Sequence, residues 1–119
     1  MASIRWFTYK GKRMLLLDFS QRSVKRVEEL TREKQQVITG QNSASVLVLA
    51  DFTGTKFDEE AVELMGKVAA VDRPYIRRAA WVGTESLPEA WFQSIQNLSH
   101  REIHRFATRE EALDFLAQE

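Results

Sequence analysis

The stretch SVLVLADFTGTKFDEE, residues 45–60, decides how this chain folds. It begins with an unbroken apolar run at residues 46–50, which is short for a helix and has no polar alternation. Such a run indicates a strand buried on both faces, in a sheet covered by helices. A polar loop with one glycine and an acidic helix start follow. In α/β sheets, this succession of strand, loop and helix N-terminus is the usual place of a functional site.

Apolar periodicity on either side of this stretch predicts the other elements. We expect strands at residues 4–9, 14–19, 75–82 and 102–107, and helices after Ser20 or Ser23, over residues 58–71, after Ser86 and after Thr108. Ser86 and Thr108 each begin a capping box, with glutamate three residues later. The order is β-β-α-β-α-β-α-β-α. It predicts one α/β domain over residues 1–119, a mixed sheet of about five strands flanked by four helices. The first strand should be antiparallel and the rest mainly parallel.

Composition excludes several classes of protein. The 17 basic residues balance the 17 acidic residues, whereas nucleic-acid binders normally carry a basic excess. Because there is no cysteine, disulfides and thiolate metal sites are excluded. No apolar run approaches the ~20 residues of a membrane span, and residues 1–6 lack the apolar core of a signal peptide. We therefore expect a cytoplasmic protein that neither enters membranes nor binds nucleic acid.

Three segments together resemble a known family. These are Tyr9-Lys10-Gly11-Lys12 before a strand, residues 46–55 (VLVLADFTGT), and Thr108-Arg109-Glu110-Glu111-Ala112-Leu113 near the end of the sequence. They are similar to the bacterial STAS/SpoIIAA-like domains, and the similarity extends over nearly the whole chain in the same element order. The resemblance implies a small mixed sheet flanked by helices, related to the anti-sigma-factor antagonists and to the CRAL-TRIO lipid-transfer folds.

The same resemblance bears on regulation. In the anti-sigma-factor antagonists, a partner kinase phosphorylates a serine at the N-terminus of the helix that follows the central strand. The corresponding place here is Asp58-Glu59-Glu60, where no side chain carries a hydroxyl. The resemblance therefore implies that fixed carboxylates replace the phosphorylation switch. The nearest hydroxyls, on Thr53 and Thr55, lie earlier in the loop.

The residues themselves favour structural roles over catalysis. Asp51 follows a central strand, as many catalytic aspartates do, but no base, nucleophile or cofactor motif accompanies it. His100 and His104 are too far apart on a strand to share a metal ion. Thr53-Gly54-Thr55 lacks the second glycine and the lysine of a phosphate-binding loop. We expect no enzymatic activity, no metal and no cofactor.

Two further groups carry alternatives. Arg73, Arg77 and Arg78 could bind an anion or an acidic partner, although the many acidic residues favour an ordinary solvated face. Trp91 and Phe92 are adjacent on a predicted helix and lie about 100° apart, so one of them should sit at the edge of the buried face. An exposed aromatic there would mark an interface or the mouth of an apolar pocket.

Two functional hypotheses follow. The first is a non-enzymatic STAS-like regulatory module that binds a protein partner through Asp51, Thr53, Gly54, Thr55, Asp58, Glu59 and Glu60, with a homodimer left open. The second is a small carrier or sensor of an apolar, lipid-like ligand. It rests on the lipid-transfer kinship and on the number of Trp and Phe residues, with Trp91 and Phe92 as candidate contacts.

Overall fold

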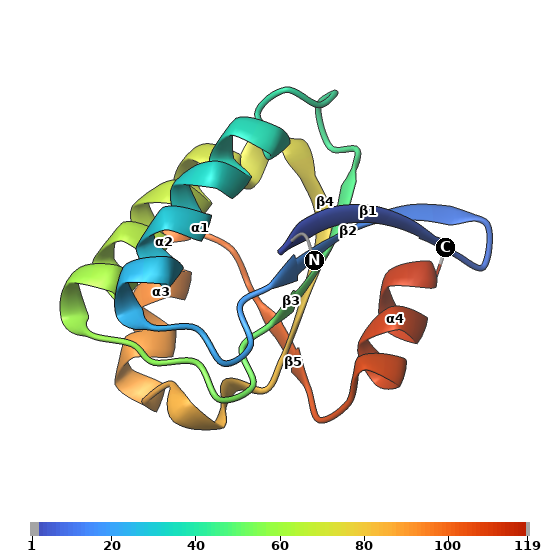
Figure 1. Cartoon of the computed structure of the whole chain (residues 1–119). Helices are drawn as coiled ribbons and strands as arrows, with labels where there is room; N and C mark the ends of the chain where they lie inside the picture. The colour runs from blue at the N-terminus through green and yellow to red at the C-terminus, as the bar shows by residue number, and fades with distance from the viewer. Residues whose placement is uncertain (1–2, 119) are drawn as a thin grey trace.

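Five strands and four α-helices form within residues 3–118, the part of the chain that the computed structural model describes (Figure 1). The strands are β1 (Ile4–Tyr9), β2 (Lys12–Asp18), β3 (Val46–Asp51), β4 (Ile76–Val82) and β5 (His104–Phe106). The helices are α1 (Val24–Ile38), α2 (Glu59–Asp72), α3 (Glu89–Ser99) and α4 (Arg109–Ala117), with short 3-10 helices at Arg73–Tyr75 and Thr84–Ser86. Residues 1, 2 and 119 lie outside the described residues. They belong to the predicted domain, and residues 1 and 2 also belong to the segment tested for a signal peptide.

The five strands stand in the sheet in the order in which they occur in the chain, β1-β2-β3-β4-β5. β1 and β2 form an antiparallel hairpin, and the other neighbouring strands are parallel. The predicted mixed sheet with an antiparallel first strand is therefore confirmed. Because the winding proceeds in one direction, α1, α2 and α3 all cover one face of the sheet, and α4 alone covers the other (Figure 1).

β3 lies at the centre, and all six of its residues are buried. Val46, Val48 and Ala50 belong to the core beneath α1, α2 and α3. Leu47 and Leu49 point the other way, into a smaller core that α4 closes with Ala112 and Leu116. The continuous apolar run is thus explained, because alternate side chains of a strand enter opposite faces and both faces are covered here.

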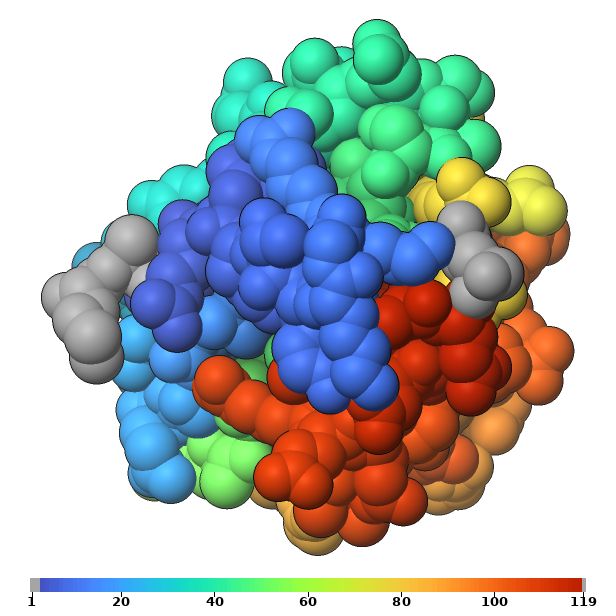
Figure 2. Space-filling model, turned by 90° about the vertical axis from the view of Figure 1, so that its right-hand side faces the viewer, coloured from blue at the N-terminus to red at the C-terminus, as the bar shows by residue number. Residues whose placement is uncertain are grey.

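The hairpin and α4 are joined at the surface. Figure 2 shows the β1–β2 hairpin and α4 lying side by side on one face of the molecule. The Tyr9 hydroxyl and the Lys10 ammonium both donate to the Asp114 carboxylate of α4, at 2.8 and 3.0 Å. The hairpin turn itself uses positive φ at Lys10 and Gly11, as a two-residue type I′ loop requires.

Side-chain caps begin three of the four helices. Ser23, Asp58 and Thr108 accept from backbone N–H groups at the starts of α1, α2 and α4. The capping box predicted at Ser86 is wrong. Ser86 lies in the 3-10 helix before α3, and its hydroxyl donates to the Thr55 carbonyl at 2.7 Å. α3 begins after Pro88 without a side-chain cap.

A buried ion pair joins α1 to α2. Lys34 Nζ lies 2.5 Å from Asp72 Oδ2, and the Asp72 side chain is fully buried. Burial lowers the pKa of Lys34 and raises the pKa of Asp72, since the charged form of each loses its hydration. The attraction between the partners opposes both shifts. Each residue is therefore tolerated only because the other is present.

This dependence predicts strong coupling between the two positions. Lys34→Met leaves Asp72 buried and unpaired, and should lower the free energy of unfolding by about 3–5 kcal/mol. Adding Asp72→Asn removes the buried, unpaired charge. The double variant should therefore lose less free energy of unfolding than the sum of the losses in the two single variants. Urea denaturation of all four proteins measures this cycle. Additivity within about 0.5 kcal/mol would contradict the coupling.

Candidate functional site

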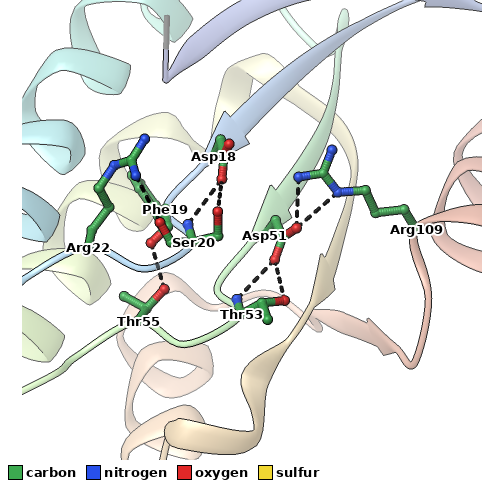
Figure 3. Close-up of polar contacts among 8 residues, drawn as sticks. All are labelled: Asp18, Phe19, Ser20, Arg22, Asp51, Thr53, Thr55 and Arg109. Carbon is green, nitrogen blue, oxygen red and sulfur yellow. Dashed lines mark hydrogen bonds and ion pairs between the residues drawn. The ribbon is translucent and has the colours of Figure 1, made fainter. Parts of the chain in front are cut away.

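The carboxyl ends of β2 and β3 lie together at one edge of the sheet (Figure 3). Asp18 and Asp51 end these two strands and stand opposite each other in the parallel register. A polar loop follows each of them. This is the edge of the sheet at which we predicted a site from residues 51–60.

Asp51 is the most heavily bonded side chain there. Its Oδ1 accepts from the backbone N–H and the hydroxyl of Thr53, at 2.9 and 2.7 Å. Its Oδ2 receives Arg109 of α4, with Nε at 2.9 Å and Nη2 at 2.7 Å. Burial raises the pKa of Asp51, but the Thr53 bonds and the Arg109 guanidinium outweigh it, so the pKa lies below its usual value. Asp51 is thereby held as a carboxylate that fixes the loop and the start of α4.

Thr55 and Gly54 also serve the loop's shape. Thr55 is buried, and its hydroxyl donates to the Phe19 carbonyl of the neighbouring loop at 2.6 Å. Gly54 has φ +66° and packs against Gln21, so a Cβ at this position would lie 2.3 Å from the Gln21 amide nitrogen. These two residues lock the loop after β3 onto the loop after β2.

The loop after β2 is a part of this edge that we did not predict. The Asp18 carboxylate accepts from the backbone N–H of Ser20 at 3.0 Å and also from its hydroxyl. Arg22 donates to the Ser20 carbonyl at 2.9 Å (Figure 3). The signal was present in the sequence, because Leu15-Leu16-Leu17-Asp18 repeats the pattern of an apolar strand that ends in aspartate, as in Leu49-Ala50-Asp51.

The three acidic residues at the start of α2 have two different roles: one caps the helix and two are exposed. Asp58 is the N-cap of α2 and accepts from the Ala61 N–H at 2.8 Å. Glu59 and Glu60 occupy the first turn and are exposed to solvent. Carboxylates at these positions also interact favourably with the helix dipole. Only Glu59 and Glu60 therefore remain available for contact with another molecule.

Trp91 and Phe92, which are adjacent on α3, differ in burial, as their positions on a helix require. Phe92 is buried, packs edge-on against Trp81 with ring centroids 5.8 Å apart, and is covered by the Arg105 guanidinium. Trp91 is half-buried and lines a groove of about 380 Å³ between α2 and α3. The groove is lined by Glu59, Val62, Glu63, Trp91, Ser94 and Leu98. The structure thus brings Glu59 and Trp91, which we predicted separately, to one place.

The chemistry available at these sites is limited. Within residues 3–118, no three His, Asp or Glu side chains are placed to hold a metal ion. Asp51 is engaged by Arg109 and Thr53 on both oxygens, which leaves it poorly placed to act as a base. His100 ends α3 in a left-handed conformation, and His104 lies in β5 with its ring against Phe115. These arrangements suit structural support and docking.

The lowered pKa of Asp51 predicts a pH dependence. Its contribution to the free energy of unfolding should be complete above the unfolded pKa, about 4, and should be lost as the pH falls through the folded pKa. Asp51→Asn should therefore cost about 1.5–3 kcal/mol at pH 7 and flatten the loss of stability toward acid. Denaturant titrations between neutral and acid pH measure both effects.

Asp58→Asn is the matched control, because asparagine caps a helix about as well as aspartate. Its effect at pH 7 should be small. Equal acid-side slopes for the wild-type protein and Asp51→Asn would contradict the role given to this carboxylate.

Comparison with known proteins shows which solved structures share this architecture. No protein-family model and no curated protein sequence matches the chain. Its structure is similar to a DUF3478-family protein described as having a SpoIIAA-like fold, from Shewanella loihica, with a TM-score of 0.70 and 18% identity over 96% of this chain and 92% of that chain. It is also similar to an anti-sigma-factor antagonist (STAS) domain protein from Planctomyces limnophilus, with a TM-score of 0.62 and 19% identity over 98% and 100% of the two chains.

At these identities the likeness concerns the fold. The helices within residues 3–118 also lack the combination of length and apolar character that crossing a membrane demands. The resemblance inferred from residues 9–12, 46–55 and 108–113 is confirmed at the level of architecture. The chain adopts the SpoIIAA-like α/β fold of STAS domains.

Proposed function

We propose that the protein is a non-enzymatic regulatory module that binds a protein partner in the groove between α2 and α3. The observation that carries this proposal is the meeting of the exposed acidic helix start with a half-buried tryptophan. Glu59 and Glu63, one turn apart on α2, face Trp91 and Leu98 of α3 across the groove. An acidic side formed by α2, opposite a largely apolar side formed by α3, suits an apolar side chain that stands next to Lys or Arg.

An exposed apolar residue supports the same surface. Leu98 of α3 remains 41% exposed and lines the groove together with Trp91. Apolar exposure of this kind, in one groove with a half-buried tryptophan, is typical of protein interfaces.

The charges of the groove are available to a partner. Glu63 forms an ion pair with Lys67 one turn along α2, but both side chains are more than 60% exposed. Exposed pairs of this type contribute little to stability, so a basic partner residue can replace Lys67 at small cost. Glu59 lies at the positive end of the helix dipole and has no internal partner among the hydrogen bonds and ion pairs of residues 3–118.

The candidate residues from the sequence take two parts in this proposal. Asp51, Thr53, Gly54, Thr55 and Asp58 fix the loop that sets where α2 begins. Glu59 and Trp91 line the groove and offer the contact surface, and Glu60 is exposed next to Glu59 in the first turn of α2. The STAS fold supports the proposal, since one of the similar structures is described as an anti-sigma-factor antagonist domain. A second copy of the chain is one partner that the groove could accept.

The test compares two matched charge reversals in the first turns of helices. Glu59→Lys should weaken partner binding at least tenfold, whereas Glu110→Lys, in the exposed first turn of α4, should not. A photo-crosslinking residue in place of Ser94 captures the partner in cells, and calorimetry with the identified partner then measures affinity. Trp91→Ala should act like Glu59→Lys. Partner affinity unchanged in both groove variants would overturn the proposal.

An apolar cavity favours a second candidate function, the carriage of an apolar ligand. About 50 Å³ of space lies between the sheet and α1 and α2, bordered by side chains such as Phe19, Ile38, Met65 and Trp81. A cavity that holds benzene measures roughly 150 Å³. A lipid-like ligand would therefore have to move these side chains outward, with the flexible Met65 the easiest to displace.

Native mass spectrometry after gentle purification tests this second candidate. A carrier should retain a bound mass that organic extraction removes, and filling the cavity with Ala79→Leu should abolish it. The exposed substitution Ala90→Leu on α3 serves as the control. A spectrum of the bare chain alone would exclude the carrier.

A further inference from the structure

The apolar cavity beneath α1 and α2 is bordered by two cations and by no carboxylate of residues 3–118. Its lining is apolar except for Lys34 of α1 and Arg101, which lies between α3 and β5. These two side chains are near each other. Burial lowers the pKa of Lys34 most, and the charge of Arg101 lowers it further, so the two cations repel across the wall of the cavity.

Only one of the two cations is balanced by a carboxylate. Lys34 is paired with Asp72, which does not itself border the cavity. Arg101 takes part in no hydrogen bond or ion pair within residues 3–118, and its Nη1 atom is buried. Because the charges of Lys34 and Asp72 cancel, one positive charge remains uncompensated at this wall.

The buried Nη1 atom of Arg101 is the central observation. Buried donors are almost always satisfied in folded proteins, because an unpaired one has lost its hydration and gained nothing in return. Nη1 carries two N–H groups, and both can donate to an anion. The other unpaired buried atom among the described residues, Asp72 Oδ1, belongs to the carboxylate already bonded to Lys34. A single negative charge inside the cavity would therefore satisfy the donor and balance the wall.

Arg101 also provides a route into the cavity. The residue as a whole is half-buried, and it borders a second pocket, of about 320 Å³, whose lining includes Arg77 and Arg78 of β4. The Arg101 side chain thus stands between the two spaces. Rotation of this long side chain would join them, so the same residue can admit a small ligand and hold it.

We propose that the cavity binds an aliphatic monocarboxylate, with its carboxylate on Arg101 Nη1 and its carbon chain among apolar side chains such as Met65 and Trp81. The inference rests on the second candidate function, the carriage of an apolar ligand, and names the class of that ligand. A carboxylate supplies the one negative charge that the wall lacks. A phosphate dianion would exceed it and would lose more hydration on entry.

The size of the cavity favours a short carbon chain. One water occupies roughly 10–15 Å³ of such a space, so about 50 Å³ accommodates roughly four groups of that size. Butyrate is slightly larger than this, and a small movement of the flexible Met65 side chain would admit it. Butyrate is therefore the probe that carries a carboxylate and a tail with the least rearrangement of the core.

Calorimetry of the whole protein with butyrate and with 1-butanol tests the choice of head group, since the two compounds share a carbon chain. We expect saturable binding of butyrate at millimolar concentrations and an affinity for 1-butanol at least roughly tenfold lower. Equal affinities that Ala79→Leu abolishes would support an apolar carrier and overturn the carboxylate assignment. Binding of neither compound would also overturn the assignment, and a lipid mass retained in native mass spectrometry would then support the carrier alone.

Two arginine variants test the position of the carboxylate. Arg101→Met removes the charge and keeps a long side chain in the wall, and it should weaken butyrate binding at least roughly tenfold. Arg32→Met, on the exposed face of α1, should bind butyrate like the wild-type protein. Because Arg101→Met also removes an unpaired buried donor, its urea midpoint without ligand should be no lower than that of the wild type. Unchanged butyrate affinity in Arg101→Met would overturn the proposal.

Fluorine NMR locates the ligand without any change at Arg101. The three tryptophans lie in different places: Trp81 lines the cavity, Trp91 lines the α2/α3 groove, and Trp6 stacks on Arg13 in the hairpin. In protein labelled with 5-fluorotryptophan, butyrate should shift the Trp81 resonance and leave those of Trp6 and Trp91 in place. A shift at Trp6 or Trp91 with none at Trp81 would overturn the site.

Discussion

The burial of β3 on both faces is the constraint on which the rest of this structure depends. A strand whose six residues are all buried needs an apolar layer above it and another below it. Three crossover helices supply the first layer, because the strands add to the sheet in chain order and always in one direction. The second face receives no crossover helix. It is covered by α4, which Arg109 ties to Asp51 at the end of β3.

This ion pair connects α4 with the loop at the carboxyl end of β3. Asp51 bonds α4 through Arg109 and orders its own loop through Thr53, while the loop positions the cap of α2. Close backbone contacts strengthen the arrangement. Gly83 at the end of β4 has φ +69°, and a Cβ there would lie 2.2 Å from the Thr53 hydroxyl. The place where α2 begins, and hence the position of Glu59, is set by contacts among three strand ends.

Local signals in the sequence were sufficient for most of the fold. The run at residues 46–50 indicated a doubly buried strand because its unbroken apolar composition reflects burial on both faces. Thr108 indicated the start of α4 because the hydrogen bond of its cap comes from a residue only three positions later. The capping box predicted at Ser86 was wrong because a contact distant in the sequence directs this side chain elsewhere. Its hydroxyl donates to the Thr55 carbonyl, 31 residues away, and α3 begins only after Pro88. A local pattern cannot register such a competitor.

The candidate sites also contain features that the local sequence predicts and features that depend on the assembled structure. Because Trp91 and Phe92 are adjacent on a helix, they point in different directions. Which of them is buried depended on Trp81, which packs against Phe92 from another element. The arginines of β4 were visible as a cluster. Arg101 joins them only through the return of the chain after α3, and whether its donors find partners is a property of the assembled structure. Arg101 also borders the apolar cavity, so one side chain separates a polar space from an apolar one.

The covering of the second face by α4 has a consequence for synthesis of the protein on the ribosome. Met14, Leu16, Leu47 and Leu49 are nearly inaccessible in the finished structure, and α4 packs Ala112 and Leu116 against their layer. The strands that carry them emerge first, whereas α4 follows β5. A nascent chain that has assembled its sheet therefore displays an apolar face until the final helix is released. In that interval the chain is a natural client for chaperones that recognise apolar surface.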